Sequence, residues 1–121
     1  MNQTRKGVVS VDSAATGGTS AAETITHNDE LRRFELTRQD VPLAHLEYVP
    51  RTTDGVVTWT FTHTWTEPSA RGQGLAAKVT VAGLDAARAA GVTVIPVCPY
   101  VSDYIAAHQE YADLLPLGGR D

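Results

Sequence analysis

The sequence has little of several features that mark specialised classes of protein. Cys98 is the only cysteine, so the chain cannot form an internal disulfide or a zinc site of several cysteines. No apolar run reaches the roughly 18 residues of a membrane-spanning helix. Basic residues (10) are outnumbered by acidic ones (14), which argues against nucleic-acid binding through a broad basic face. We therefore expect no membrane and no nucleic acid among the partners.

The remaining composition is typical of one folded domain. Hydrophobic residues make up 42% of the 121 residues, which is enough for a single core. Secreted domains of this size usually carry paired cysteines, so the lone cysteine favours the cytoplasm. Arg5 and Lys6 precede no apolar run, so no signal peptide is expected. Residues 13–22 are small and lack an apolar period, so we expect a disordered tail over residues 1–23 and one domain over residues 24–121.

Alternating apolar and polar residues predict an antiparallel meander of three strands, over residues 34–37, 41–49 and 56–64. Pro50 is expected to end the second strand, and Asp54-Gly55 supplies the positive-φ positions of a hairpin turn. One face of the third strand is expected to carry Val57, Trp59, Phe61 and His63.

The period then changes to that of a helix. Apolar residues recur on one helical stripe at Leu75, Val79, Ala82, Ala86 and Ala89, and Gly91 is placed to stop the helix. Residues 92–97 are typical of a short buried strand, and a second helix is expected from about Ser102, as N-cap, to Leu115. A strand-helix-strand unit implies a parallel pair. The predicted fold class is therefore α/β, with a β-meander followed by a β-α-β-α unit.

The junction between the third strand and the first helix has an unusual composition. No Ser, Thr, Asp or Asn stands next to Gly74 to cap the helix, and no acid stands in its first turn. Two glycines and Arg71 are there instead. Free N–H groups at the positive end of a helix, approached over glycines, favour a phosphate or diphosphate. The alternative is a plain glycine-rich turn with solvated amides.

This junction resembles a known motif. Arg71-Gly72-Gln73-Gly74-Leu75-Ala76 looks like the acetyl-CoA diphosphate motif of the GNAT N-acetyltransferase superfamily. Two further stretches, His63-Thr64 and Val97-Cys98-Pro99-Tyr100-Val101, resemble its very short, YjdJ-like branch, and the resemblance spans about residues 25–115.

The resemblance implies a compact GNAT-like fold in which the parallel strand pair splays apart around the thioester. It implies acetyl-CoA as co-substrate, no metal, an amine acceptor on a small molecule or a protein lysine, and a monomer or homodimer. The implied cofactor-binding residues are Trp65 and Thr66 for the pantetheine arm, the diphosphate loop Arg71, Gly72, Gln73, Gly74, Leu75 and Ala76, and Pro99.

Three side chains are candidates for the chemistry of acetyl transfer. Cys98 is expected at a strand end beside the thioester, where it is either a covalent nucleophile or a small buried hydrophobe. His63 is either a general base or a core histidine. Tyr104, on the second helix, either protonates the CoA thiolate, as the resemblance implies, or packs that helix on the sheet. His45 and Glu67 are weaker candidates for the base.

Two other functions remain open. The chain lacks the length for the segments that normally build an acceptor pocket, which would suit a non-catalytic CoA- or acyl-CoA-binding module or sensor subunit. A plain protein-interaction domain, whose glycine turn binds nothing, is the third possibility.

Overall fold

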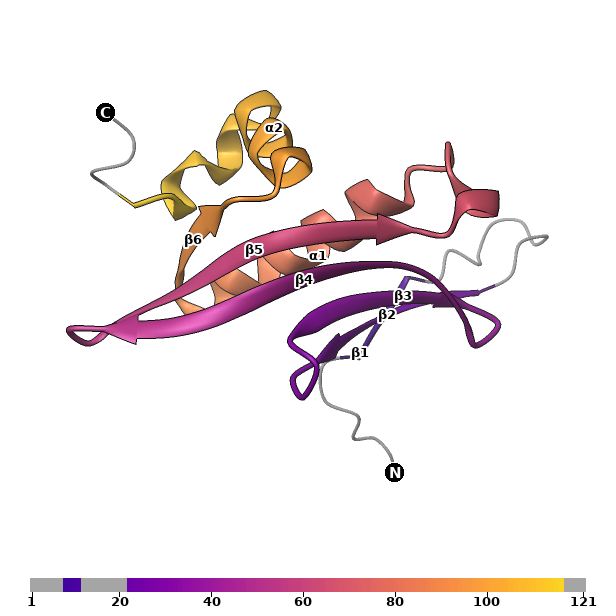
Figure 1. Cartoon of the computed structure of the whole chain (residues 1–121), viewed down its shortest axis with the longest axis horizontal. Helices are drawn as coiled ribbons and strands as arrows, with labels where there is room; N and C mark the ends of the chain where they lie inside the picture. The colour runs from indigo at the N-terminus through magenta and orange to yellow at the C-terminus, as the bar shows by residue number, and fades with distance from the viewer. Residues whose placement is uncertain (1–7, 12–21, 117–121) are drawn as a thin grey trace.

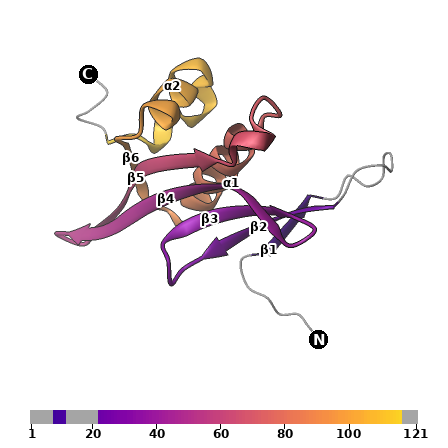
Figure 2. The same cartoon turned by 45° about the vertical axis from the view of Figure 1, so that its right-hand side comes forward.

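The computed structural model describes the backbone of residues 8–11 and the backbone and side chains of residues 22–116. These residues form one six-stranded sheet in the order β1-β2-β3-β4-β5-β6, with helices on one face and at one edge (Figures 1 and 2). The strands are β1 (Val8–Val11), β2 (Glu23–Asn28), β3 (Arg33–Arg38), β4 (Val41–Thr53), β5 (Val56–Thr66) and β6 (Thr93–Pro96). The helices are the 3₁₀ helix η2 (Pro68–Ala70), α1 (Leu75–Ala90), α2 (Pro99–Ala107) and the 3₁₀ helix η3 (Gln109–Leu114).

The topology confirms the predicted α/β fold. Strands β1 to β5 pair antiparallel with their neighbours, and β6 pairs parallel with β5 after the crossover through α1. The meander therefore precedes a β-α-β-α unit, as the change of period predicts. No helix among the described residues is long and apolar enough to cross a membrane.

The prediction of a disordered tail over residues 1–23 is wrong at two places. Val8–Val11 form β1, which pairs with β2, and β2 itself begins at Glu23. The segment Val8–Val11 contains three β-branched valines that favour a strand, but it is too short for an alternating pattern to stand out. Residues 1–7 and 12–21 lie outside the described residues.

The prediction that Pro50 ends its strand is also wrong, because β4 continues to Thr53. The Tyr48 N–H donates to the Arg32 carbonyl at 3.0 Å, so it points towards the β3 side of β4. Because these directions alternate along a strand, the ring nitrogen of Pro50 also lies on that side. The pairing of β3 with β4 ends at Glu47, so the missing donor breaks no ladder bond.

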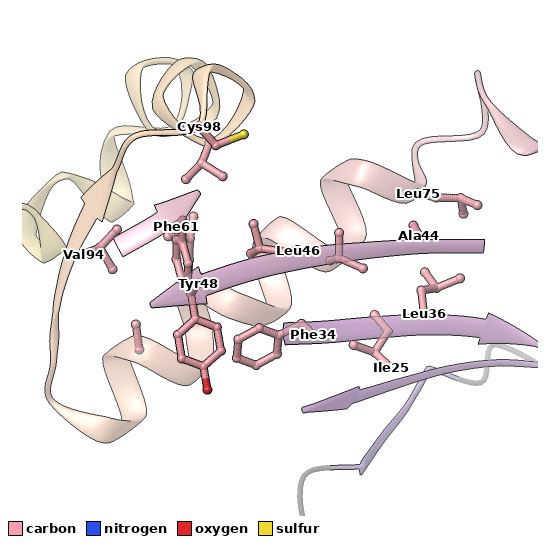
Figure 3. Close-up of a cluster of buried hydrophobic side chains, with 14 of the residues drawn as sticks. Ile25, Phe34, Leu36, Ala44, Leu46, Tyr48, Phe61, Leu75, Val94 and Cys98 are labelled. Carbon is pink, nitrogen blue, oxygen red and sulfur yellow. The ribbon is translucent and has the colours of Figure 1, made fainter. Parts of the chain in front are cut away.

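Helix α1 lies across one face of the sheet (Figure 1). The helix itself is confirmed, and Gly91 ends it in the left-handed region with φ 73°. Its predicted apolar stripe is only partly right, because Leu75 and Val79 are buried but Ala82 and Ala86 are half-buried and Ala89 is exposed. The buried face continues instead through Gly83, Leu84 and Ala87. A Cβ on Gly83 would lie 2.7 Å from the Leu46 side chain, so a glycine is required for this close approach. Figure 3 shows the strand side chains of this core, among them Leu46, gathered in front of α1.

Helix α2 begins at Pro99, earlier than the predicted Ser102, and ends at Ala107. Proline is favoured in the first turn because its missing N–H would have no partner there. The chain continues as η3, and its Tyr111 hydroxyl donates to the Asp85 carboxylate of α1 at 3.0 Å. Helix α2 and η3 thus lie beyond β6 and are tied to α1 at the edge of the sheet (Figure 1).

Candidate functional site

The pairing of the two parallel strands stops before β5 ends. Phe61 and Pro96 are the last partners, and the Phe61 carbonyl accepts bonds from the Val97 and Cys98 N–H groups at 3.1 and 2.9 Å. From there β6 turns into α2, whereas β5 runs on to Thr66. The predicted splay is therefore present, and we call the space between the end of β5 and Cys98 the strand gap.

A β-bulge at Thr62 decides which side chains face the α1 side of the strand gap. Tyr48 lies opposite Phe61, but the preceding Glu47 lies opposite His63, so Thr62 is an extra residue in β5. One inserted residue moves every following side chain to the other face. Beyond Phe61 the α1 side of the sheet is therefore lined by Thr64, which lies opposite the buried Leu46.

The backbone at the end of β5 offers hydrogen-bonding groups to the strand gap. The Glu67 N–H donates to the Leu43 carbonyl of β4 at 2.8 Å, so the backbone groups of Glu67 point towards β4. By alternation, the backbone groups of Trp65 also point to β4, and those of Thr64 and Thr66 point to the gap. Of the two residues predicted to bind a ligand arm through their backbone, Thr66 has its groups directed at the gap and Trp65 does not.

The start of α1 has the open geometry that the sequence predicts. Gly74 is the N-cap in the left-handed region, with φ 77°, and neither a capping side chain nor a first-turn acid is present. Gly72 is also left-handed, with φ 86°. A Cβ on either glycine would meet no atom within 4 Å. The residues from Arg71 to Gly74 are exposed, so the first-turn N–H groups of α1 are accessible to an anion.

A set of charged side chains holds this loop against β2 and β3. The Arg38 guanidinium donates to the Gln73 side chain at 2.9 Å and to the Glu23 carboxylate at 2.7 Å. Lys78 of α1 donates to the same carboxylate at 2.6 Å. Burial raises the pKa of Glu23, but the hydrogen bonds and charges of Lys78 and Arg38 outweigh burial and hold the pKa below its ordinary value. Sequence spacing offers no signal for this network, because its members come from three elements.

Cys98 lies on the α1 side of the strand gap, as the N-cap of α2. It is 5% exposed, and its Sγ lies 3.9 Å from the Thr64 hydroxyl. Figure 3 shows it above Phe61, beyond the end of β6. Pro99, the other predicted residue of this segment, is exposed in the first turn of α2.

His63 is not the core histidine or the partner of Cys98 that simple alternation predicts. The bulge turns it to the opposite face of the sheet, where it is exposed. Its ring centroid lies 6.4 Å from that of His45. The His45 ring also stacks on Trp65, with centroids 5.2 Å apart, and its Nε2 lies 2.9 Å from Glu47 Oε2. We call His45, Glu47, His63 and Trp65 the open-face cluster.

The structure does not bring Tyr104 together with Cys98. Tyr104 comes six positions after Cys98, which on a helix is a rise of about 9 Å and a rotation of about 240°. The Tyr104 ring stacks on His108 with centroids 3.8 Å apart, and it lies 6.3 Å from the Tyr111 ring. Burial raises the pKa of Tyr104 above its ordinary value, with smaller contributions from nearby acidic groups.

Glu67, a weaker candidate for the base, is the N-cap of η2. Its carboxylate accepts from the Ser69 N–H at 3.4 Å and the Ser69 hydroxyl at 3.3 Å, which caps η2. Among the described residues no group of three or more His, Cys, Asp or Glu side chains could hold a metal ion.

Comparisons with known proteins fit this geometry. The sequence model of the GCN5-related N-acetyl-transferase family matches residues 33–114. The fold resembles that of a ribosomal-protein-alanine N-acetyltransferase from Brucella melitensis biovar Abortus 2308, with a TM-score of 0.51 at 13% sequence identity. That match covers 69% of this chain and 60% of the other, so this chain spans less than two thirds of the length of its structural relative. No curated protein sequence matches the chain significantly.

The family match includes both strands of the parallel pair, the glycine loop and Cys98. It therefore confirms the resemblance that the Arg71–Ala76 motif indicates. The chain belongs to the GCN5-related N-acetyltransferase family of acyltransferases.

Proposed function

We propose that the chain is an acetyl-CoA-dependent N-acetyltransferase that acts on an amine of a small molecule or a protein lysine. The observation that carries the proposal is the uncapped, glycine-flanked start of α1, which follows a strand whose parallel partner diverges after Phe61. A diphosphate site at the helix and a channel between the strands are what an acetyl-CoA molecule requires.

The glycine loop supports binding of the diphosphate. The N–H groups from Gln73 to Ala76 would donate to its oxygens, and the positive end of the α1 dipole favours its charge. The exposed Arg71 adds a positive charge, and the absence of side-chain atoms on Gly72 and Gly74 leaves room for a ligand against the backbone.

The strand gap supports binding of the pantetheine arm. The backbone groups of Thr64 and Thr66 would bond to the amides of the arm as a further strand would. Because the backbone of Trp65 faces β4, we assign this role to Thr64 in place of Trp65. The arm would then bring the thioester to the end of the gap where Cys98 lies beside Thr64.

We propose Cys98 as the nucleophile that carries the acetyl group. In this step a bond forms between Cys98 Sγ and the acetyl carbon, the bond between that carbon and the CoA sulfur breaks, and the thiol proton passes to the leaving sulfur. The acceptor amine then takes the acetyl group and restores the thiol. The alternative is direct attack of the amine on the CoA thioester, with Cys98 only packed against Thr64.

The experiment is exposure of the purified protein to acetyl-CoA, alone and with a panel of amines. The panel includes a lysine peptide, a peptide with a free N-terminus, a polyamine and an aromatic amine. Intact mass spectrometry detects acetyl-protein, and release of free CoA thiol measures turnover. Cys98→Ala removes the proposed nucleophile and Cys98→Ser is the size-matched control.

An acetyl-protein that is absent in Cys98→Ala and that transfers its acetyl group to an amine supports the covalent route. Full amine acetylation by Cys98→Ala overturns the role of Cys98 but retains the transferase. Tight binding of CoA and acetyl-CoA with no thioester loss on any amine overturns the transferase in favour of a CoA-binding module. Failure of every CoA species to raise the melting temperature points to an interaction domain instead.

A further inference from the structure

We infer that His45, oriented by Glu47, accepts the proton that the acceptor ammonium loses, and that the acceptor approaches over the sheet face opposite α1. This inference rests on the proposed acetyl transfer. It assigns a role to the open-face cluster, which cofactor binding does not use.

The bulge at Thr62 places this cluster beside the strand gap. His63 and Trp65 lie on the part of β5 that has no partner on the β6 side, and their partners on β4 are Glu47 and His45. Directly opposite residues share a face of the sheet, so all four side chains lie on the face away from α1. On the α1 side of the sheet Leu46 and Phe61 are fully buried and Cys98 is 5% exposed, whereas His63 on the other side is exposed. The side of the open-face cluster is therefore the more accessible one for an acceptor.

The His45–Glu47 pair has the geometry of an oriented base. The two side chains are two residues apart on β4 and meet at 2.9 Å between Nε2 and Oε2. An ionised carboxylate only accepts hydrogen bonds, so Nε2 carries the hydrogen and the neutral ring has its lone pair on Nδ1. Stacking on Trp65 fixes the plane of the ring. His63, by contrast, is exposed, and among the described residues the one aromatic ring contact of His63 is with His45.

The surroundings keep His45 neutral at pH 7. Burial and then the charge of Arg33 lower its pKa below the ordinary value, His63 contributes in the same direction, and Glu47 opposes them. The groups that face His45 are Arg33 and Glu35 from β3, Glu47 from its own strand and His63 from β5. Glu35 is bonded to Arg33 at 2.6 Å, so the negative charge left to meet a cationic amine is that of Glu47.

Two protons leave the acceptor nitrogen during the transfer. The acceptor ammonium gives a proton to His45 Nδ1, directly or through one water. The resulting amine nitrogen bonds to the thioester carbonyl carbon, and the bond from that carbon to sulfur breaks. The nitrogen loses its second proton as the leaving sulfur gains one, and His45 returns its proton to solvent. Glu47 is a positioning residue, because it acts through the His45 ring.

The test is the dependence of kcat/KM on pH between about 4.5 and 9, with the best alkyl amine of the panel. With wild-type protein we expect the rate to fall only at a pH below the ordinary pKa of histidine, about 6.5, because the pKa of His45 is lowered. His45→Asn should lose about 10²-fold at pH 7, and its rate should then rise tenfold per pH unit. In that variant only amine already deprotonated in solution can react, and the pKa of a lysine amine is about 10.4.

Matched variants and substrates separate this role from a structural one. Glu47→Gln should shift the fall in rate on the acid side of the profile, the acid limb, to lower pH. The reason is that the Glu47 carboxylate raises the pKa of His45. Glu30→Gln, the same change on the exposed turn between β2 and β3, should leave the profile unchanged. An aromatic amine, which is neutral at pH 7 and needs no base, should be acetylated equally by wild type and His45→Asn.

The inference is overturned if His45→Asn keeps the wild-type profile, if it loses the same factor with the aromatic amine, or if His63→Asn alone removes the acid limb. Absence of turnover by wild-type protein on every amine is a different result. It overturns the proposed function itself.

Discussion

Alanine substitutions at three left-handed glycines test whether the start of α1 is a ligand site. Gly55, Gly74 and Gly91 have φ of 82°, 77° and 73°, and a Cβ on any of them would meet no atom within 4 Å. The three substitutions therefore impose the same backbone strain without a steric clash. Gly55 lies in the β4–β5 hairpin turn and Gly91 at the other end of α1, so both are matched controls for Gly74.

The strain sets the expected loss of stability. A left-handed conformation costs a non-glycine residue about 1–2 kcal/mol, and each kcal/mol lowers the melting temperature of a domain of this size by about 4–8 °C. We expect all three variants to melt about 4–16 °C below wild type. Thermal denaturation without ligand measures this effect, and the three values should agree within a few degrees.

Ligand binding should separate Gly74→Ala from its controls. Its Cβ would project into the space that we propose for the diphosphate, so we expect the Kd for CoA to rise at least tenfold, which is about 1.4 kcal/mol. Gly55→Ala and Gly91→Ala should bind CoA like wild type in isothermal titration calorimetry. A Gly74→Ala protein that binds CoA as tightly as Gly55→Ala would refute the reasoning, because the ligand would then not touch this backbone.

Three further substitutions test the packing around the site. Glu23→Gln should lower the free energy of unfolding by an amount that is constant above about pH 4.5 and shrinks as the pH falls below it; urea titrations at several pH values measure this, and a pH-independent difference would contradict it. Tyr111→Phe should lose about 1–3 kcal/mol, because the hydroxyl bonds the Asp85 carboxylate, and an unchanged midpoint in denaturant would show that this bond is not formed. Gly83→Val should lose about 1–3 kcal/mol by overpacking against the buried Leu46, and a melting temperature above that of wild type would show that the helix can shift.

Local patterns predict most of the fold because each depends on a single element. The alternation of apolar and polar residues predicts β3 and the first part of β4, and the helical period with Gly91 at its end predicts α1. The errors arise where an element depends on its neighbours. Pro50 is tolerated because β3 ends before it, and β1 is a strand because β2 pairs with it. Neither fact is visible in the residues concerned.

The same distinction between local and neighbour-dependent features applies to the candidate site. The glycine loop is local, so its motif predicts both its conformation and the family. The network of Glu23, Arg38 and Lys78 that holds the loop is built from three elements, and no spacing in the sequence links them. A search for the site by motif alone therefore finds the residues that would touch the diphosphate but not those that hold the loop in place.

The bulge at Thr62 has the largest consequence for function. Thr62 is one of five threonines at alternate positions in β5, and nothing in its own neighbourhood marks it as the extra residue. The register with β4 is what identifies it. Without the bulge, His63 would share the α1 side with Phe61 and could face Cys98. With it, the thiol lies on one side of β5 and the imidazoles of His63 and His45 lie on the other. In the proposed mechanism the thioester and the acceptor amine would then reach the strand gap from opposite faces of the sheet, and the register of β5 with β4 is what separates them.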